Sequence, residues 1–264
     1  MVQNKSLIFK SVPKGTPKAG EHLAVEDRPI DLDASLPENG MIVQTLYLSF
    51  DPYQRGRMRD ADVKSYSPAY QLDQPIRNSS IAKVLKSAHK KYSKGDLIQL
   101  YMDGPFQEYV TLEAGDIGDG VWKLDNSYDL DPALYLGPLG MPGLTAYSGF
   151  YEIGQPKKGE TIFISAASGA VGSMVGQLAK RQGLTVIGSV GDKEKLKYIM
   201  DDLGFDAGFN YKEEKPIEAL KRLAPGGIDI YFESVGGEHL EAALSAMKQW
   251  GRVGKCLTPT TSSR

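Results

Sequence analysis

The fold of this chain is decided by the stretch Glu160-Thr-Ile-Phe-Ile-Ser-Ala-Ala-Ser-Gly-Ala-Val-Gly-Ser-Met-Val-Gly-Gln-Leu-Ala-Lys180. It begins with an apolar run of strand length (161–165) and continues as a turn of small residues (167–172). It ends with apolar residues at helical spacing (171–180). A strand, a tight turn of small residues and a helix in this order are typical of the first unit of a dinucleotide-binding fold.

Small residues have a physical purpose in such a turn. A pyrophosphate must approach backbone N–H groups at the positive end of a helix, and a side chain would block it. The pattern here is Ala-x-Gly-x-x-Gly, because Ala167 stands where a full fingerprint has its first glycine. Gly169 permits the approach, and Gly172 lets the helix pack close to the strand. Small residues also serve plain helix–strand packing, but the second apolar strand after Gly183 favours a cofactor turn.

Strands and helices alternate through the second half of the chain. We expect strands over 160–167, 184–190, 207–211, 228–234 and 251–257, and helices over 170–182, 192–203, 213–224 and 237–248. A further helix is expected over 142–151, with Pro142 in its first turn. This alternation predicts a parallel sheet with crossover helices. It supplies five strands, where a complete doubly wound dinucleotide fold of this type has six.

The first half of the chain predicts an all-β module. Short apolar runs recur between Pro and Gly residues, over 6–9, 22–26, 41–50, 81–85, 96–101 and 106–112. The polar segment 55–74 is expected to be an irregular surface excursion. We therefore expect a β-rich domain over 1–128, an incomplete dinucleotide-binding domain over 129–257, and a polar tail over 258–264.

Composition and charge exclude several classes of protein. A net charge of −2 over 264 residues implies no general surface for nucleic acid or another polyanion. The single cysteine, Cys256, rules out an intrachain disulfide and is compatible with a reducing compartment. The first ten residues contain no long apolar stretch, so we expect no secretory signal and no membrane span. The default expectation is a cytoplasmic protein.

Several motifs in order resemble one enzyme family. They are Leu48-Ser-Phe-Asp-Pro-Tyr-Gln-Arg-Gly-Arg-Met58, Leu136-Gly-Pro-Leu-Gly-Met-Pro-Gly-Leu-Thr-Ala-Tyr147, the turn and helix 166–180, Phe209-Asn-Tyr-Lys212 and Val235-Gly-Gly237. Together they resemble the zinc-independent medium-chain dehydrogenases/reductases. Within that family they resemble the branch of leukotriene B4 12-hydroxydehydrogenase, prostaglandin reductase and alkenal double-bond reductases. The likeness runs from about residue 5 to Val253.

The resemblance implies a fold and an activity. It implies a GroES-like N-terminal catalytic domain followed by a Rossmann domain, with the active site in the cleft between them. It implies reduction of the C=C bond of an α,β-unsaturated aldehyde or ketone by hydride transfer from NADPH, without zinc. The expected domain 1–128 contains no cysteine, and its two histidines, His22 and His89, lie far apart in the sequence.

The resemblance and the glycine turn together give a set of candidate cofactor-binding residues. These are Met141, Thr145, Ala167, Ser168, Gly169, Ala170, Val171, Gly172, Ser189, Lys195, Tyr211 and Ser234. Met141 and Thr145 match family positions beside the nicotinamide. Many relatives have Asn where this chain has Ser234, and a serine reaches less far, so this contact is the weakest of the set.

The end of the second strand favours NADPH over NADH. NAD-preferring folds place an acidic residue there to accept the ribose 2′-hydroxyl. Here the strand ends in Ser189-Val190, which leaves room for a 2′-phosphate. Lys195 matches the family's phosphate-binding lysine, and Lys193 lies beside it. Both lysines would also suit a solvated helix start, and Asp192 weakens the positive charge.

Without a metal, the carbonyl must be polarised by hydrogen bonds. Tyr53 resembles a family residue that lines the substrate pocket, so it is the candidate catalytic residue. A turn tyrosine that caps the core is the competing interpretation. Arg55 and Arg57 are expected to stabilise the fold or to face solvent. The two early histidines are expected at the surface, and His239, in a late helix beside charged residues, is not a catalytic candidate.

Three other functions stay open at this point. Related zinc-independent enzymes reduce quinones, and other members act as alcohol dehydrogenases in biosynthetic pathways. The third alternative is a non-catalytic fragment that binds NADPH without turnover.

The resemblance also predicts that the chain ends early. Full-length relatives continue into a sixth strand and dimerise through that edge, so a homodimer of this chain is in doubt. The codons GGT-AAG-TGT for Gly254-Lys255-Cys256 would contain a splice-donor consensus, and a retained intron would then supply the polar tail. A true truncation and a gene-model error are the competing explanations.

Overall fold

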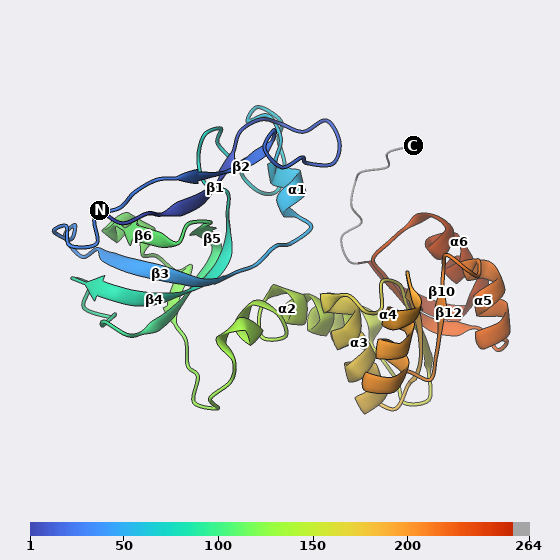
Figure 1. Cartoon of the computed structure of the whole chain (residues 1–264). Helices are drawn as coiled ribbons and strands as arrows, with labels where there is room; N and C mark the ends of the chain where they lie inside the picture. The colour runs from blue at the N-terminus through green and yellow to red at the C-terminus, as the bar shows by residue number, and fades with distance from the viewer. Residues whose placement is uncertain (256–264) are drawn as a thin grey trace. The chain divides into compact units, whose positions relative to one another are not determined.

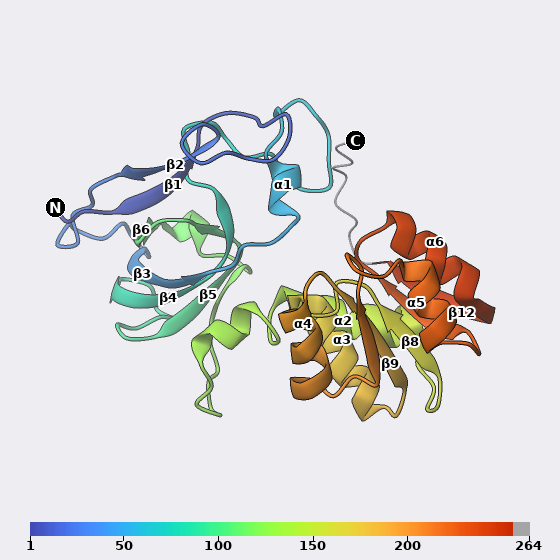
Figure 2. The ribbon, with the colours of Figure 1, turned by 45° about the vertical axis from the view of Figure 1, so that its right-hand side comes forward.

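The computed structural model describes residues 1–255, and the chain forms two compact units (Figures 1 and 2). The first unit runs from Met1 to Leu136, and the second begins at Gly137. The sequence placed this boundary near residue 128. The predicted polar tail 258–264 and Cys256, which belongs to the splice-site hypothesis, lie outside the described residues.

The first unit is β-rich, as expected for a GroES-like domain. Its elements are β1 (Lys5–Phe9), β2 (Leu23–Asp27), β3 (Met41–Leu48), α1 (Gln54–Arg57), β4 (Arg77–Ser87), β5 (Leu97–Pro105), β6 (Tyr109–Leu112), η1 (Ala114–Asp116), β7 (Val121–Lys123) and η2 (Pro132–Leu136). Strands β1 and β2 form an antiparallel pair. The other five form an antiparallel sheet in the order β6-β3-β4-β5-β7. Alternating apolar residues of these strands, among them Val43, Val84 and Ile98, form its core.

The segment 55–74 is not the peripheral excursion that its polarity predicted. Arg57, Met58 and Tyr70 are each 6% exposed. The Arg57 guanidinium donates to the carbonyl oxygens of Pro68, Arg77 and Met102 and lies 4.4 Å from the centre of the Tyr70 ring. A charged side chain can be buried here because backbone carbonyls satisfy its donors. Arg57 therefore stabilises the fold, one of the two roles left open for it.

The second unit is a doubly wound α/β domain. Its elements are α2 (Met141–Ser148), η3 (Gly149–Gly154), β8 (Thr161–Ile164), α3 (Ala170–Arg181), β9 (Thr185–Val190), α4 (Lys193–Lys197), η4 (Tyr198–Asp202), β10 (Ala207–Asn210), α5 (Pro216–Leu223), β11 (Ile228–Glu233), α6 (Gly237–Ala246) and β12 (Met247–Lys255). The five strands are parallel, in the order β10-β9-β8-β11-β12. The strand order reverses between β8 and β11, which is the topological switch point of a Rossmann fold.

Helices cover both faces of this sheet (Figure 2). On one face, α2, α3 and the turn η4 pack against residues such as Ile162, Ile164 and Val186. On the other face, α5 and α6 pack against Phe163, Ile187 and Tyr231. Successive residues of each strand thus point into opposite cores, so a strand buried on both sides reads as a continuous apolar run.

Several elements differ from their predicted bounds, among them two helices and the last strand of the second unit. The helices expected over 142–151 and 192–203 each end in a π-helical turn, η3 and η4. The turn η4 carries the chain to Phe205, whose ring occupies the space beside Gly176, where a Cβ would lie 2.0 Å from it. Strand β12 begins at Met247, inside the helix expected up to 248, because Met247 pairs with Ile228 ahead of a register shift.

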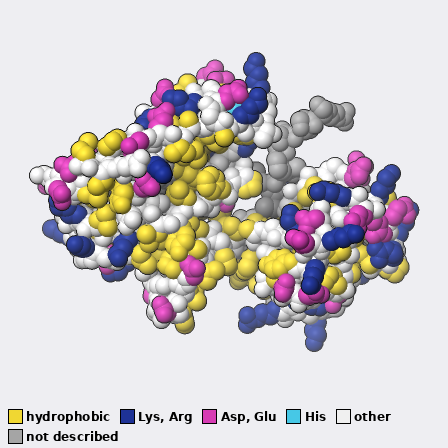
Figure 3. All heavy atoms as spheres, in the orientation of Figure 1, with side chains coloured by type: hydrophobic (Ala, Val, Ile, Leu, Met, Phe, Trp, Pro, Cys, Tyr) yellow, Lys and Arg dark blue, Asp and Glu magenta, His cyan; other side chains and the backbone are white. Residues whose placement is uncertain are grey.

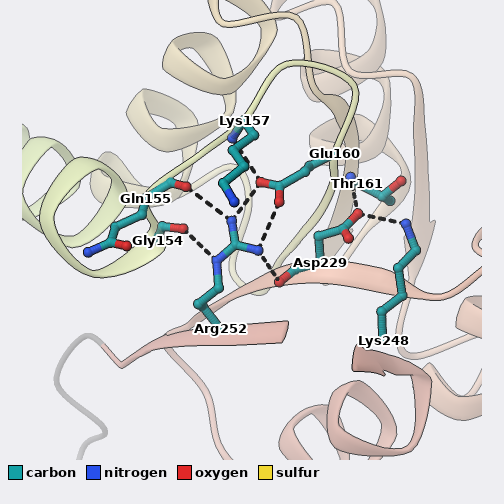
Figure 4. A network of polar contacts seen from close by, with 8 residues as sticks. All are labelled: Gly154, Gln155, Lys157, Glu160, Thr161, Asp229, Lys248 and Arg252. Atoms are coloured by element: carbon teal, nitrogen blue, oxygen red, sulfur yellow. Dashed lines mark hydrogen bonds and ion pairs between the residues drawn. The ribbon is translucent and has the colours of Figure 1, made fainter. Parts of the chain in front are cut away.

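A polar network joins the amino-terminal ends of β8 and β11 to β12 (Figure 4). The Arg252 guanidinium makes two hydrogen bonds to the Glu160 carboxylate, at 2.9 and 2.6 Å, and others to the carbonyls of Gly154, Gln155 and Asp229. The Asp229 carboxylate accepts from the Thr161 N–H at 2.8 Å and from Lys248 at 2.7 Å. The network lies at the end of the sheet opposite the turn that follows β8.

Surface charge is mixed over the second unit. On the face drawn in Figure 3, lysines and arginines are interspersed with acidic side chains over this unit, whereas hydrophobic side chains gather on the first. An interspersed surface creates no strong field of one sign. Within residues 1–255, no helix is both long enough and apolar enough to cross a membrane.

Candidate functional site

The turn after β8 presents an open helix end. Gly169 and Ala170 are exposed at the start of α3, a helix of 12 residues, whereas Ala167 and Gly172 are buried. The first N–H groups of a helix have no acceptor within it, and they carry the positive end of its dipole. The turn therefore offers unhindered donors to an anion.

Close packing fixes the residue types in this turn. A Cβ on Gly172 would lie 2.5 Å from the Ala166 carbonyl oxygen, and one on Gly169 would lie 3.1 Å from it. Ala166 itself has φ +49°, in the left-handed region, which costs an L-residue about 1–2 kcal/mol. The strained residue thus lies one position before Ala167, which is the first residue of the Ala-x-Gly-x-x-Gly pattern. Such strain gathers at ligand-binding turns.

Ser189 closes the second parallel strand, as predicted, but its hydroxyl does not face solvent. Ser189 is 0% exposed, and its Oγ lies 2.8 Å from Nε2 of His239 on α6. The strand end carries no acidic side chain that would repel a 2′-phosphate. Direct contact between Ser189 and a cofactor stays a prediction.

The next helix begins with a capped turn. The Asp192 carboxylate accepts a hydrogen bond from the Lys195 N–H at 2.9 Å and pairs with the Lys195 ammonium at 3.3 Å. The backbone N–H of Lys195 is the main cause that lowers the pKa of Asp192. Asp192 is therefore engaged as an N-cap. The Lys195 side chain stays exposed, so it can exchange this partner for a phosphate.

Tyr211 follows the third strand and lies over the same segment. It is 44% exposed, and its N–H donates to the Val190 carbonyl at 3.1 Å. A Cβ on Gly191 would lie 3.0 Å from the Tyr211 hydroxyl oxygen, so the hydroxyl lies close to Gly191. The Tyr211 hydroxyl and the Lys195 helix therefore both adjoin residues 191–192.

The carboxyl ends of β8 and β11 are joined at the switch point. The Ser234 N–H donates to the Ser165 hydroxyl at 2.9 Å. The buried Glu233 carboxylate accepts from the N–H groups of Val235 and Gly236 and so shapes the loop into α6. Ser234 itself is half-buried at this edge. Ligands of open α/β sheets bind at such a switch point.

Two further candidates lie on α2. Met141 and Thr145 are half-buried and four residues apart, so they share one helix face. The helix packs on α3 through Ala146, which contacts the core that contains Val175. Ten of the twelve predicted cofactor residues thus lie in the turn after β8, in α3 or α4, or at the carboxyl ends of β9, β10 and β11, and the other two lie on α2. Ala167, Gly172 and Ser189 are buried among them.

Tyr53, the candidate catalytic residue, lies in the first unit within a polar network. Its hydroxyl lies 2.8 Å from Asn78 Oδ1 and 3.1 Å from Asp51 Oδ2. Asn78 is fully buried, and its amide nitrogen donates to the Ser49 carbonyl and to Asp51. That orientation leaves Asn78 Oδ1 as an acceptor, so Tyr53 donates into the network. Burial first, and then the Asp51 charge, raise the pKa of the Tyr53 hydroxyl well above its usual range.

Sequence reasoning missed part of this site. It did not connect Asp51 and Asn78 to Tyr53, although Asp51 belongs to the same motif.

Two histidines are more buried than the sequence indicated. His22 was expected at the surface, yet it is 8% exposed and accepts a hydrogen bond from the Lys18 N–H. Sequence reasoning also set aside His239, which is 6% exposed and contacts two residues of the predicted set. Within residues 1–255, no three His, Cys, Asp or Glu side chains are grouped as metal ligands would be.

The residues at the carboxyl edge fit a dinucleotide. The glycine turn leaves a cradle that a Cβ would fill, and α3 aims its amino end at it. The end of β9 is neutral, and an exposed lysine follows. A pyrophosphate at the turn and a 2′-phosphate near Lys195 suit this donor set.

Comparison with known proteins gives the same result. Residues 5–119 match the family described as the N-terminal domain of oxidoreductase, and residues 170–256 match the zinc-binding dehydrogenase family. An NADP-dependent oxidoreductase of Cochliobolus heterostrophus is 57% identical over 96% of this chain and 71% of its own length. A 2-alkenal reductase (NADP(+)-dependent) of Nicotiana tabacum is 45% identical over 97% of this chain and 72% of its own.

A solved structure agrees with these relatives. CurA of Vibrio vulnificus in complex with NADPH has a TM-score of 0.83 and 35% identity, over 94% of this chain and 70% of that chain. The fold and these relatives agree. The chain therefore belongs to the medium-chain dehydrogenase/reductase family, in its alkenal reductase branch, and is an NADP-dependent oxidoreductase.

Proposed function

We propose that this protein reduces the C=C bond of α,β-unsaturated aldehydes or ketones with NADPH. One observation carries the proposal: the first unit holds a neutral tyrosine hydroxyl, Tyr53, in a network that fixes its position. The similarity to a 2-alkenal reductase supports the substrate class. When bound, NADPH supplies the hydride.

The reaction sets a clear electrostatic task. The β-carbon gains a C–H bond, the π electrons of the double bond move toward the carbonyl, and an enolate oxygen develops negative charge. Water then supplies a proton to the α-carbon, which gives the saturated carbonyl compound. The protein lowers the barrier by stabilising that oxygen in a place prepared before the reaction.

Tyr53 suits this task because it stays protonated at working pH. Its hydroxyl has one proton, which at rest is directed to Asn78 at 2.8 Å. A charged oxygen accepts an O–H more strongly than an amide carbonyl does. As negative charge develops on the substrate oxygen, the Tyr53 hydroxyl is therefore favoured to move its hydrogen bond from Asn78 to that oxygen. A hydrogen bond that forms mainly in the transition state raises kcat. Asp51 and Asn78 keep the ring in place during this exchange.

The test is product analysis with NADPH and a medium-chain 2-alkenal. The proposal predicts a saturated aldehyde, and it predicts that Tyr53→Phe lowers kcat/KM about a hundredfold while NADPH affinity stays unchanged. Tyr128→Phe is the matched control, because Tyr128 is 84% exposed in the same unit. An unaltered kcat/KM in Tyr53→Phe would remove Tyr53 from the mechanism.

The same assay separates the other candidate functions. Faster NADPH oxidation with a simple quinone would identify a quinone reductase. Reduction of NADP⁺ by an allylic alcohol would identify an alcohol dehydrogenase. Stabilisation by NADPH with no turnover of any of these substrates would identify a nucleotide-binding protein without catalysis.

A further inference from the structure

We propose that His239 is a positioning residue for the 2′-phosphate of NADP, and that it acts through the ring of Tyr211. This inference rests on the use of NADPH in the proposed function and is independent of which substrate is reduced. It assigns cofactor discrimination to a residue of α6, the helix that follows the fourth parallel strand. That helix carries none of the predicted cofactor residues.

The contacts of His239 are specific on every side. Its ring packs edge-to-face against Tyr211, with centroids 5.2 Å apart and an interplanar angle of 77°. It lies parallel to Phe163, at 6.5 Å and 6°. Its Nε2 lies 2.8 Å from the Ser189 hydroxyl. The ring is only 6% exposed, so these contacts fix its orientation.

Tyr211 is the element that needs such support. It is 44% exposed and has few constraints from the core. The Tyr211 hydroxyl lies close to Gly191, because a Cβ on Gly191 would be 3.0 Å from it. The Tyr211 ring packs against the His239 ring. The two contacts together hold the hydroxyl beside residues 191–195, where the exposed Lys195 ammonium favours a phosphate. Loss of the His239 ring would free Tyr211 to rotate away from that position.

Direct charge is not the means by which His239 acts. Burial lowers the pKa of its ring, against the opposing charges of Glu233 and Glu238, so the ring is neutral at physiological pH. A neutral ring adds no cation for the phosphate. Its contribution is the edge-to-face contact, which requires an aromatic ring and not a hydrogen-bonding group alone.

Two substitutions separate the ring from its hydrogen bond. His239→Gln retains a polar group for Ser189 and loses the ring, whereas His239→Phe retains the ring and loses the hydrogen bond. We would measure the Kd of adenosine 2′,5′-bisphosphate and of adenosine 5′-monophosphate by calorimetry with the full chain. These probes carry only the adenosine end, so the result does not depend on turnover of an enal.

His239→Gln should raise the Kd of the bisphosphate about tenfold and that of the monophosphate less than about twofold. His239→Phe should bind both probes like the unaltered protein. His89→Gln is the matched control, because His89 also packs on a tyrosine, Tyr92, at 5.1 Å, but in the first unit. In a Tyr211→Ala background, His239→Gln should have no further effect, because the two residues act as one unit.

Other outcomes would overturn the proposal. Equal weakening of both probes in His239→Gln would indicate a structural role only. Weakening in His239→Phe with unchanged affinity in His239→Gln would assign the effect to the Ser189 hydrogen bond, and equal weakening in both would show that the ring alone is not sufficient. If His239→Gln does not fold, His239→Phe and Tyr211→Ala still decide: full affinity for the bisphosphate in Tyr211→Ala excludes the route through Tyr211.

Discussion

Replacing Arg252 by methionine removes the group that ties β12 to the start of the parallel sheet (Figure 4). The Glu160 carboxylate then keeps one hydrogen bond, from the Lys157 N–H at 2.8 Å, and the carbonyls of Gly154 and Gln155 lose their donor. Methionine retains much of the apolar stem, so the loss is one of charge and hydrogen bonds and not mainly one of volume.

The magnitude follows from burial. Removing one partner of a buried ion pair costs about 3–5 kcal/mol, and an exposed pair contributes about 0–1 kcal/mol. The Arg252 and Glu160 side chains are 25% and 15% exposed, which places this pair nearer the buried limit. We therefore expect Arg252→Met to lower the free energy of unfolding by about 3 kcal/mol. That corresponds to a decrease in Tm of about 6–12 °C.

Thermal unfolding followed by circular dichroism measures this effect. Arg222→Met is the control, because Arg222 pairs with Glu214 on the same unit with its side chain 55% exposed. It should cost no more than about 1 kcal/mol. A Tm for Arg252→Met within about 2 °C of the unaltered protein, or an equal loss in Arg222→Met, would refute the reasoning from burial.

Three further predictions concern the cofactor edge and acid stability. Gly172→Ala should weaken NADPH binding at least about tenfold in calorimetry. The new Cβ would lie 2.5 Å from the Ala166 carbonyl oxygen and would displace the turn after β8. Lys195→Ala should raise the KM for NADPH about tenfold and leave that for NADH unchanged, whereas Lys193→Ala should alter neither by more than about threefold. Burial alone would raise the pKa values of Glu160 and Asp229. Hydrogen bonds from Arg252 and Lys248, backbone N–H donors and the nearby positive charges together outweigh it and lower these pKa values from 4.5 and 3.8. These two carboxylates stabilise the fold fully at pH values above their ordinary pKa, and this stabilisation is lost as pH falls through their lowered pKa values. Tm should therefore fall as the solution is acidified below pH 4.5. The fall should be smaller in Glu160→Gln, which has one of these carboxylates fewer.

The parallel domain was largely predictable from sequence, because its signals are local. Strands β8 to β11 are apolar runs bounded by glycines and charged residues, and each lies within its predicted range. The helix ends were less certain, since the turn η4 depends on where Phe205 meets Gly176 and not on its own sequence. The strand β7 was missed because Val-Trp-Lys is too short to show periodicity.

The site was predictable where motifs are contiguous and hidden where contacts are distant. The glycine turn and Lys195 follow from adjacent residues. The hydrogen bond between Ser189 and His239 joins residues 50 positions apart, and that between Tyr53 and Asn78 joins residues 25 positions apart. No local pattern marks such pairs. The segment around the buried Arg57 was expected at the surface because it is polar. Arg57 donates to backbone carbonyl oxygens, and every residue has one, so no residue type in the sequence marks these acceptors.

The most direct test of the central claim is to follow the hydride. The purified chain would be given a 2-alkenal and NADPH that carries deuterium at the transferred position of the nicotinamide, and the product would be analysed by mass spectrometry and NMR. The account predicts a saturated aldehyde with deuterium on the β-carbon. Deuterium on the hydroxyl-bearing carbon of an allylic alcohol, or NADPH binding with no transfer at all, would contradict it.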